Sequence, residues 1–172
     1  VNQLIFMIST IIRNSIKKGI FKNPNPAQHI DNIKVDNKRE RYLTKSEIKE
    51  LLEKLKNLPE LLLFTKLSLN TGGRLNTILS IQKKDLNLEH NSVTLTDHKN
   101  VCTYTGYYDD ELKYYLKNNI ENLYPNDNII KYKQVTLSNK LRKRLNELFN
   151  KGLDEDDRKN RVVIHTLRHT FA

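Results

Sequence analysis

The segment HTLRHTFA, residues 165–172, is the most informative stretch of the sequence, because it places chemically active side chains on one short predicted helix. His165 and Arg168 are three positions apart, so both emerge on the same helix face. Leu167 and Phe171 are four positions apart and have the spacing of core residues. An apolar side combined with a His and an Arg favours a site for an anionic group such as phosphate.

A second arginine of interest lies in the segment Thr71-Gly72-Gly73-Arg74. Arg74 follows a glycine-rich break and begins a predicted helix, where backbone N–H groups lack intrahelical partners. Two guanidinium groups, an imidazole and a helix N-terminus suit a pentacoordinate phosphate, because guanidinium binds two oxygens through parallel hydrogen bonds and keeps its charge. Donors set around developing charge typically account for about 10²–10³ in rate each. Such a site needs no metal ion and no cofactor.

Around these two segments the sequence predicts a mostly α-helical domain with a small antiparallel β-sheet, an α+β fold. Thr44 and Glu47 have the spacing of a capping box, so a helix is expected to begin at residue 45. Two β-like runs that flank a polar tip predict a hairpin. The expected elements are helices over 45–55, 59–69 and 75–79, strands over 92–96 and 101–104, and helices over 109–123 and 139–149, the last capped by Ser138.

The front of the chain predicts a separate element. Apolar residues recur at helical spacing; they are Leu4, Ile5, Ile8, Ile11, Ile12 and Ile16. Gly19 stands where a left-handed C-cap is wanted, and the prolines of Asn23-Pro24-Asn25-Pro26 disfavour helix in the residues before them. We expect a helix with one uncovered apolar face, followed by a polar, basic linker over 23–41.

The charge of the chain favours a polyanionic partner. The 172 residues carry 30 Lys and Arg against 20 Asp and Glu, a net charge of +10, and the first 41 residues hold eight basic against three acidic residues. Lys and Arg bind phosphates with release of counterions. A lysine-rich composition from an AT-rich genome is the competing explanation. No stretch reaches the roughly 20 apolar residues of a membrane span. A single cysteine, Cys102, is compatible with a reducing cytoplasm.

The motifs together resemble the tyrosine recombinase, or phage integrase, family. The family's first arginine lies in a Thr-Gly-x-Arg setting, matched by residues 71–74, and a lysine at a β-hairpin tip is matched by Lys99. The family's His-x-Leu-Arg-His-Thr-Phe-Ala segment is matched by residues 165–172 at every fixed position. The resemblance implies the last helix of a core-binding domain over 1–22, a basic interdomain linker over 23–41 and an incomplete catalytic domain over 42–172.

The resemblance implies site-specific DNA recombination or integration, typical of mobile elements, through a phosphotyrosyl intermediate. Arg74 and Arg168 would clamp the scissile phosphate, Lys99 would protonate the leaving oxygen, and His165 would act as base or hydrogen-bond partner of the nucleophile. The implied partners are double-stranded DNA and other copies of the protein in a tetramer on paired sites. No cofactor and no membrane are implied, and the implied location is the cytoplasm.

Two features depart from the family pattern. The family usually has an acidic residue three positions after its first arginine, where this chain has Thr77. The family's nucleophilic tyrosine lies beyond the position that corresponds to Ala172, and all eight tyrosines of this chain precede His165. We therefore expect these 172 residues to bind DNA without cutting it.

Other basic residues are expected to contact the DNA backbone, which positions a protein without reading sequence. These residues are Lys34, Lys38, Arg39, Arg41 and His169. His169 could instead support its own helix. Three alternatives to a recombinase remain open at this point: a non-catalytic DNA-binding accessory module of the same fold, a type IB topoisomerase-like enzyme, and a basic helical protein with chance matches.

Overall fold

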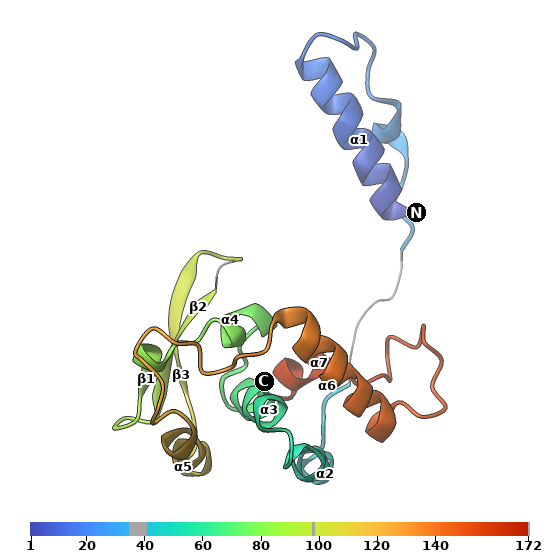
Figure 1. Ribbon diagram of the computed structural model, residues 1–172. Coiled ribbons are helices and arrows are strands. Elements are labelled where there is room, and N and C mark those ends of the chain that lie inside the picture. Colours follow the sequence, from blue (N-terminus) through green and yellow to red (C-terminus); the bar gives the residue numbers. More distant parts are fainter. Residues whose placement is uncertain (35–40, 98, 172) are drawn as a thin grey trace. The chain divides into compact units, whose positions relative to one another are not determined.

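The computed structural model describes residues 1–34, 41–97 and 99–171, and the chain divides into two compact units, Val1–Asn37 and Lys38–Ala172. We describe each unit by itself, using the labels of Figure 1. The predicted DNA contacts Lys38 and Arg39 lie outside the described residues.

The first unit is a helix with a returning segment packed along it. Helix α1 covers Asn2–Lys17 and ends before Gly19, which has a φ of +71° as the sequence predicts. A short 3₁₀ helix, η1 (Pro26–His29), follows and contacts α1. The Asn25 side chain donates to Ser9 Oγ at 2.8 Å, and Asn2 exchanges two hydrogen bonds with the backbone of Ile33 at 2.8 and 2.9 Å.

This returning segment belongs to the first part of the polar, basic linker that the sequence predicts over 23–41. Helix α1 ends at Lys17, ahead of the prolines, with Gly19 in the expected left-handed conformation. Asn2 of α1 then binds the backbone of Ile33, and Ser9 Oγ accepts from the Asn25 side chain, contacts that the sequence did not predict. Most of the apolar face of α1 is exposed within the unit; its exposed members are Leu4, Ile8, Ile11 and Ile16.

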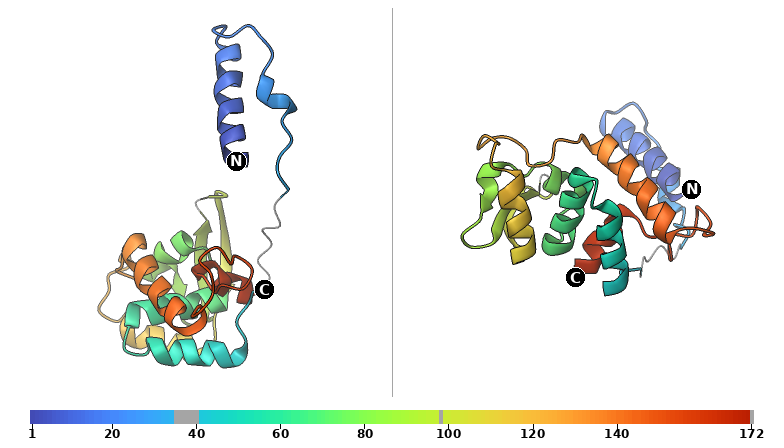
Figure 2. Two further views of the ribbon diagram at one scale, coloured as in Figure 1. Left: turned by 90° about the vertical axis from the view of Figure 1, so that its right-hand side faces the viewer. Right: turned by 60° about the horizontal axis from the view of Figure 1, so that its bottom comes forward.

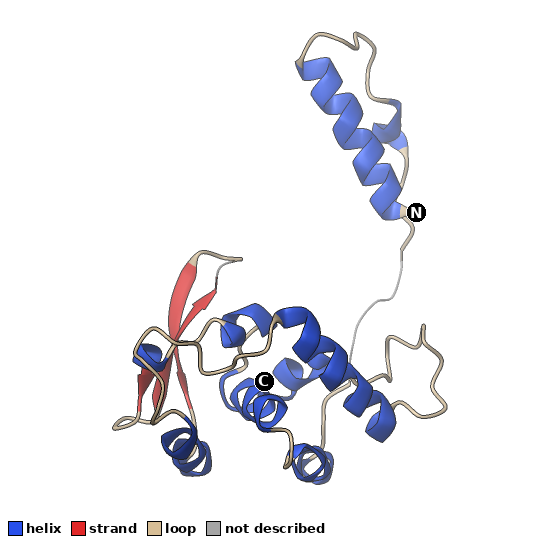
Figure 3. Ribbon diagram, viewed as in Figure 1, coloured by secondary structure: helices blue, strands red, loops and turns tan. Residues whose placement is uncertain are grey.

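The second unit is α+β, as expected from the sequence, and Figure 3 shows its sheet at one side of a group of helices. Its elements are α2 (Lys45–Leu55), α3 (Pro59–Thr71), α4 (Leu75–Leu79), the 3₁₀ helix η2 (Lys83–Asp85), β1 (Leu86–Asn87), β2 (Ser92–Asp97), β3 (Cys102–Tyr107), α5 (Asp110–Asn119), α6 (Gln134–Phe149) and α7 (Ile164–Phe171).

The unit is built around α3, which contacts α2, α4, α6, α7 and β3. A helix buried on most of its surface must be apolar on more than one face, and Leu61, Leu62, Leu63, Phe64 and Leu67 of α3 are all buried. Figure 2 (right) shows α3 in the middle of the unit, with the sheet and α5 on one side and α6 on the other. Because α3 is central, its C-terminal end at Thr71 and Gly72 is packed among the elements that surround the helix.

The three strands form an antiparallel sheet in the order β1-β2-β3. Val93, Leu95 and Asp97 of β2 are buried and alternate with exposed residues, the period-2 pattern of a strand with one covered face. Leu95 pairs with Tyr104 and Asp97 pairs with Cys102, so Asp97 belongs to the last pair before the hairpin turn. A β-carbon added to Gly106 of β3 would come within 2.9 Å of Thr71 Cγ2, so this glycine allows the strand to approach the end of α3.

Several predicted boundaries are wrong by about one turn. Helix α6 begins at Gln134 rather than after Ser138, because Leu137 is buried one turn ahead of Leu141 and extends the apolar face. Helix α5 ends at Asn119 rather than at 123. The carbonyls of Glu121 and Leu123 instead accept hydrogen bonds from Lys83 Nζ at 3.1 and 2.7 Å.

The hairpin also differs in detail from the prediction. Strand β3 runs from Cys102 to Tyr107, further than the predicted 101–104, and Val101 lies in the turn with a φ of +51° and 91% exposure. Strand β1 has only two residues, and the sequence analysis did not predict it. These differences leave the predicted order of helices and hairpin unchanged.

Candidate functional site

The turn that presents Arg74 is tightly packed. Helix α3 ends at Gly72 in the left-handed conformation, with a φ of +60°. A β-carbon at Gly72 would lie 2.5 Å from Cδ1 of Phe171, so both the backbone angle and the neighbouring ring exclude a side chain here. The hydroxyl of Thr71 accepts from the Gly73 N–H at 3.2 Å. Arg74 then becomes the N-cap residue of α4.

Helix α7 brings the second arginine to this turn. Nη1 of Arg168 donates to the carbonyl oxygen of Gly72 at 2.7 Å, which joins two segments 96 positions apart. Leu167 is fully buried and Thr166 nearly so, and α7 packs mainly against α3. The Thr170 hydroxyl accepts from the Leu43 N–H at 2.9 Å, which ties α7 to the start of the unit. The HTLRHTFA segment is therefore anchored by its buried side and presents the other.

Three of the four predicted catalytic residues line one pocket. Arg74, His165 and Arg168 surround a hollow of about 230 Å³ whose other walls are Phe64, Ser68, Gly73, Leu75 and Ile164. The arginines are only partly buried and His165 is exposed, so an anion from solvent can reach all three. The rings of His165 and His169 meet edge to face with centroids 4.6 Å apart. The structure thus brings together residues that are far apart in the sequence.

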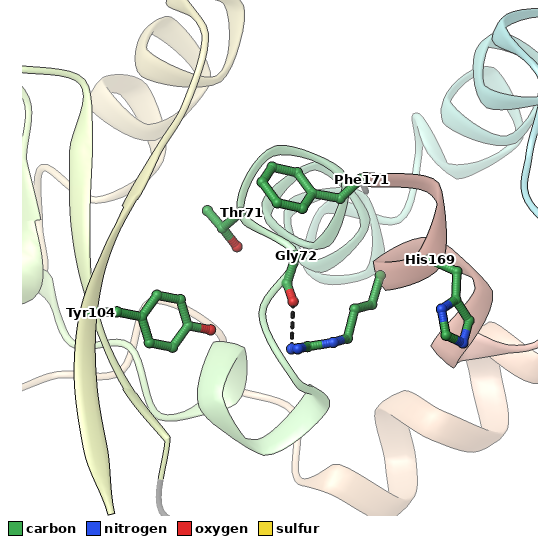
Figure 4. A pocket seen from close by; sticks show the side chains of 6 residues that line it. Thr71, Gly72, Tyr104, His169 and Phe171 are labelled. Carbon is green, nitrogen blue, oxygen red and sulfur yellow. Dashed lines mark hydrogen bonds between the residues drawn. The ribbon is translucent and has the colours of Figure 1, made fainter. Parts of the chain in front are cut away.

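Arg168 also lines a second pocket next to the first, of about 380 Å³. Figure 4 shows this pocket, in which Tyr104 from β3 points its ring toward the Arg168–Gly72 hydrogen bond, while Phe171 and His169 come from α7. Tyr104 is the only tyrosine that lines a pocket together with a predicted catalytic residue, among the pockets described for residues 1–34, 41–97 and 99–171.

Lys99 is not among the residues that line the Arg74 pocket. It lies in the turn between β2 and β3 and is exposed. Its backbone N–H donates to Oδ1 of Asp97 at 3.1 Å, so the backbone of this turn is held even though the side chain is exposed to solvent. Lys99, the predicted general acid, is therefore joined through its backbone to Asp97, the ion-pair partner of Arg74, but its side chain does not line the Arg74 pocket.

Asp97 is a site residue that the sequence analysis missed. Its side chain is 4% exposed and forms an ion pair with the Arg74 guanidinium, which is 36% exposed. The sequence does contain a signal for it: Val93, Leu95 and Asp97 alternate on the inward face of one strand, and an acid at such a position requires a cationic partner. The identity of that partner depends on tertiary packing and could not be read from the strand.

Thr77 occupies the position where the family usually has an acid, and it is buried on α4. It lines a different pocket, together with Thr94 and Thr96 of β2. Thr77 therefore does not line the hollow that Arg74, His165 and Arg168 share.

The predicted DNA-backbone residues have varied surroundings. Lys34 and His169 are exposed. Arg41 is bound to Glu47 through two hydrogen bonds and to the carbonyl oxygen of Tyr42. The guanidinium of Arg41 lowers the pKa of Glu47, with help from hydrogen bonds of Thr44. Arg41 thus supports the start of α2, and its predicted contact with DNA stays a prediction.

Within the part of the chain that the structure describes, no helix is long and apolar enough to pass through a membrane. In the same residues no group of three or more His, Cys, Asp or Glu side chains is arranged to hold a metal ion.

The fold and the pocket define an α+β domain that presents two arginines and a histidine at one hollow. The chain matches the model of the Phage integrase family over residues 41–172. It is 33% identical over 139 residues to tyrosine recombinase XerA from Saccharolobus solfataricus, a match that covers 81% of this chain and 44% of that protein. The chain therefore belongs to the phage integrase family of tyrosine recombinases, which confirms the resemblance seen in its motifs.

Solved structures share the fold at low identity. A lambda integrase tetramer bound to a Holliday junction superimposes with a TM-score of 0.73 at 18% identity, covering 98% of this chain and 52% of that one. The Tn1549 transposon integrase, in complex with transposon right end DNA, superimposes with a TM-score of 0.72 at 16% identity, covering 99% of this chain and 64% of that one. The chain spans roughly half the length of the relatives that it matches.

Proposed function

We propose that this chain is the part of a site-specific tyrosine recombinase that binds duplex DNA and activates one phosphodiester for attack by a tyrosine. The observation that carries the proposal is the shared pocket of Arg74, His165 and Arg168. A phosphodiester is a single negative group with two non-bridging oxygens, and guanidinium groups bind such oxygens in pairs of parallel hydrogen bonds.

The roles within the pocket follow from the chemistry of each group. Arg74 and Arg168 stabilise the charge that develops on the non-bridging oxygens. His165 accepts the proton of the attacking tyrosine, and Lys99 gives a proton to the departing 5′ oxygen. A 3′-phosphotyrosyl bond replaces the broken P–O bond, and a 5′-hydroxyl of a partner strand later reverses the step. For Lys99 this role requires the hairpin turn to approach the phosphate when DNA is bound.

The nucleophile of the reaction is proposed to be none of the eight tyrosines in this sequence. Tyr104 is the internal tyrosine to exclude, because it shares a pocket with Arg168. The 172-residue chain is therefore expected to form no covalent adduct with a nicked suicide substrate on a denaturing gel. An adduct that disappears in Tyr104→Phe would contradict this part of the proposal and identify Tyr104 as the nucleophile.

Further parts of the proposal come from the family. Lys34, Lys38, Arg39, Arg41 and His169 are proposed to bind phosphates of the DNA backbone, with Arg41 exchanging part of its hydrogen bonding to Glu47. The active assembly is proposed to be a homotetramer on two paired DNA sites in the cytoplasm. Residues 1–22 are proposed to be the last helix of a core-binding domain, 23–41 the linker and 42–172 the catalytic domain; the exposed apolar face of α1 supports the first of these.

The phosphate-binding role can be tested on the 172-residue chain itself. A duplex that the chain binds tightly is first selected from a random-sequence pool. Its phosphates are then replaced one at a time by neutral methylphosphonates, and the dissociation constant is measured for each duplex. We expect one phosphate at which replacement weakens binding about tenfold, since hydrogen bonds to charged groups contribute roughly 1.5–3 kcal/mol.

The matched variants decide whether that phosphate occupies the pocket. In Arg74→Ala and Arg168→Ala the effect of the critical methylphosphonate should largely vanish, because the charge that senses the phosphate has been removed. In Arg142→Ala, an exposed arginine of α6 that lines none of the described pockets, the effect should remain. An equal effect in all three variants would sink the proposal. If no single methylphosphonate replacement weakens binding by the wild-type chain, the accessory DNA-binding module would be favoured instead.

A further inference from the structure

Asp97 is a buried carboxylate at a position that the proposed chemistry does not use directly. It ends β2, its residue exposure is 3%, and it belongs to the last cross-strand pair before the turn that contains Lys99. Burying a charge is costly unless that charge is paired and hydrogen-bonded. An inward-facing acid on a strand of an otherwise apolar face therefore has a specific partner or a specific task.

The two oxygens of Asp97 serve two different parts of the site. Oδ2 accepts from Nη1 of Arg74, and Oδ1 accepts from the backbone N–H of Lys99 at 3.1 Å. The second bond spans two residues and is of the kind by which Asp side chains fix turns. A single carboxylate thus connects the first arginine, at the N-terminus of α4, with the hairpin turn that carries the proposed general acid.

The connection matters because the Arg74 side chain is long and only partly enclosed by packing. This side chain is 36% exposed while that of Asp97 is 4% exposed, so the carboxylate is the buried end of the pair and sets where the guanidinium lies. Guanidinium carries five N–H donors, and one directed at Asp97 leaves others for a phosphate. Orientation fixed before binding lowers the entropy cost of forming the contacts.

The orienting acid of Arg74 comes from the sheet rather than from the helix that this arginine begins. Within the described residues, Asp97 is the acid that forms an ion pair with Arg74. Thr77, three positions after Arg74 on α4, is buried and lines another pocket. The position of the Arg74 guanidinium therefore depends on the packing of β2 beside α4.

We propose that Asp97 is a positioning residue that aligns Arg74 for the phosphate and couples that arginine to the Lys99 turn. This inference rests on the proposed function, since it takes the pocket to be a phosphate site. It makes a prediction of definite sign. If the Asp97 carboxylate only neutralised Arg74, removing it would strengthen phosphate binding. If it positions Arg74, removing it weakens phosphate binding.

The test uses the 172-residue chain and the critical methylphosphonate duplex. In the wild-type chain the methylphosphonate is expected to weaken binding about tenfold. In Asp97→Ala we expect that factor to fall to about twofold or less, since Arg74 is no longer held. Asp97→Asn has a single acceptor oxygen, which can still serve the Lys99 N–H, while an NH₂ donor replaces the oxygen that accepts from Arg74; the factor should therefore fall to about twofold or less here too.

A spectroscopic measurement separates positioning from general loss of stability. In ¹⁵N-resolved spectra the Lys99 amide should shift and exchange with solvent faster in Asp97→Ala, and keep most of its protection in Asp97→Asn. Glu111→Gln is the matched control, because it removes the acidic partner of the buried Lys66 on α3 at a place outside the pocket. This control should leave both the Lys99 amide and the methylphosphonate factor unchanged at temperatures where every variant is folded.

The possible outcomes distinguish the two proposals. If the wild-type chain senses no phosphate, the proposed function fails and this inference fails with it. If Arg74→Ala loses the methylphosphonate effect while both Asp97 variants keep or increase it, the phosphate site stands and the positioning role of Asp97 is wrong. Loss of the effect in Glu111→Gln as well would show that reduced stability alone is sufficient, which also overturns the inference.

Discussion

Arg168 is the residue with the most demanding position in the site. It lines both pockets, and its guanidinium already gives one donor to the Gly72 carbonyl at 2.7 Å. A planar group with several donors in fixed directions can hold that carbonyl and still present a fork to a phosphate. Lysine has a single charged nitrogen and cannot do both with the same geometry.

Arg168→Ala should therefore abolish strand cleavage and largely preserve DNA binding. In a form of the protein that includes the nucleophilic tyrosine, we expect adduct formation to slow by about 10²–10³ or more, the typical effect of removing one preset donor. The rate is measured by covalent trapping on a suicide duplex, and binding by gel shift. Arg168→Lys should remain at least roughly tenfold slow. Near-normal cleavage by either variant would contradict the assigned role.

Gly72 is required for two separable reasons, and substitutions can measure each. Alanine there must adopt a φ of +60° and would meet the Phe171 ring at 2.5 Å. We expect Gly72→Ala to lower the free energy of unfolding by about 2–3 kcal/mol, of which the backbone angle accounts for about 1–2. Gly152→Ala, at a φ of +78° with no atom within 4 Å, should show the backbone cost alone. Urea denaturation measures both.

The contribution of the ring follows from a double variant. In Gly72→Ala with Phe171→Ala the steric clash is removed, so the destabilisation should be smaller than the sum of the two single variants. Strict additivity would mean that the exposed Phe171 ring simply moves aside. The stability of the turn would then depend on backbone conformation only.

At this scale the sequence predicts the arginines and the histidine but not their partners. His165 and Arg168 share a helix face by spacing alone, and Arg74 follows a glycine break. All three residues could therefore be recognised from local sequence. The bonds from Arg74 to Asp97 and from Arg168 to Gly72 join positions 23 and 96 apart. They depend on how the sheet and α7 pack on α3, which no local pattern encodes.

Among the elements, α2 has the most clearly defined beginning. The Thr44 hydroxyl accepts from the Glu47 N–H at 3.3 Å, and Glu47 accepts from the Thr44 N–H at 2.8 Å, which completes the predicted capping box. Arg41 adds two hydrogen bonds to the same carboxylate. The Glu47 carboxylate therefore accepts hydrogen bonds both from the N-cap residue of α2 and from Arg41, which precedes the helix.

Glu47→Gln should isolate the charge in this arrangement, because glutamine can still complete the capping box. We expect a decrease in stability of about 0.5–1 kcal/mol at about pH 7, since the pair is partly exposed. The pKa of Glu47 is lowered in the folded chain, so its contribution is present above the unfolded value near 4.5 and disappears as pH falls through the lower folded value. The wild-type and Glu47→Gln stabilities should converge at acidic pH.

Chemical denaturation between neutral pH and about pH 3 checks this expectation, with Glu50→Gln as the control. Glu50 lies on the same helix and is exposed, and this substitution should change little at any pH. A wild-type advantage over Glu47→Gln that persists undiminished at the acidic end would show that the stabilisation does not come from the ionised carboxylate.

The sequence predicts which elements exist better than where they end. Capping chemistry fixed the start of α2, and glycine fixed the end of α3, because both signals are local. Helix α6 begins at Gln134 with no side-chain cap, so capping chemistry, which favours Ser138 as the cap, predicts a start about one turn too late. Strand β1 has two residues and exists through pairing with β2, which makes it invisible to periodicity.

At the scale of the whole chain, the two units differ in how many apolar side chains each buries. The buried apolar cluster extends from Leu43 to Leu167 and lies entirely within the second unit. The first unit has hydrogen bonds between α1 and its returning segment but leaves most of its apolar face exposed. The sequence indicated this asymmetry through the one-sided helix, although it did not predict the returning segment.

This asymmetry predicts that the second unit folds by itself and that the first adds mainly electrostatic binding. A chain that begins at Lys38 keeps the whole core, so its thermal unfolding midpoint should match that of the second unit in the intact chain. Residues 1–37 carry five Lys and Arg against two acids. Each DNA phosphate that they neutralise adds about 0.9 to the steepness of log K against log salt, so the shortened chain should show a shallower slope.

The matched variant keeps the first unit and removes charge alone. Lys17, Lys18 and Lys22 replaced together by Gln leave the hydrogen bonds of Asn25 and Asn2 in place. If the first unit acts through charge, this triple variant should reproduce most of the reduced salt slope of the shortened chain, measured by fluorescence anisotropy on one duplex. A slope unchanged in both would confine phosphate binding to residues 38–172. A slope reduced only by deletion would instead mean that the first unit binds phosphates through its fold or through the basic residues left in the triple variant. Binding by Lys17, Lys18 and Lys22 alone would be lost in both variants, because it depends only on their charge.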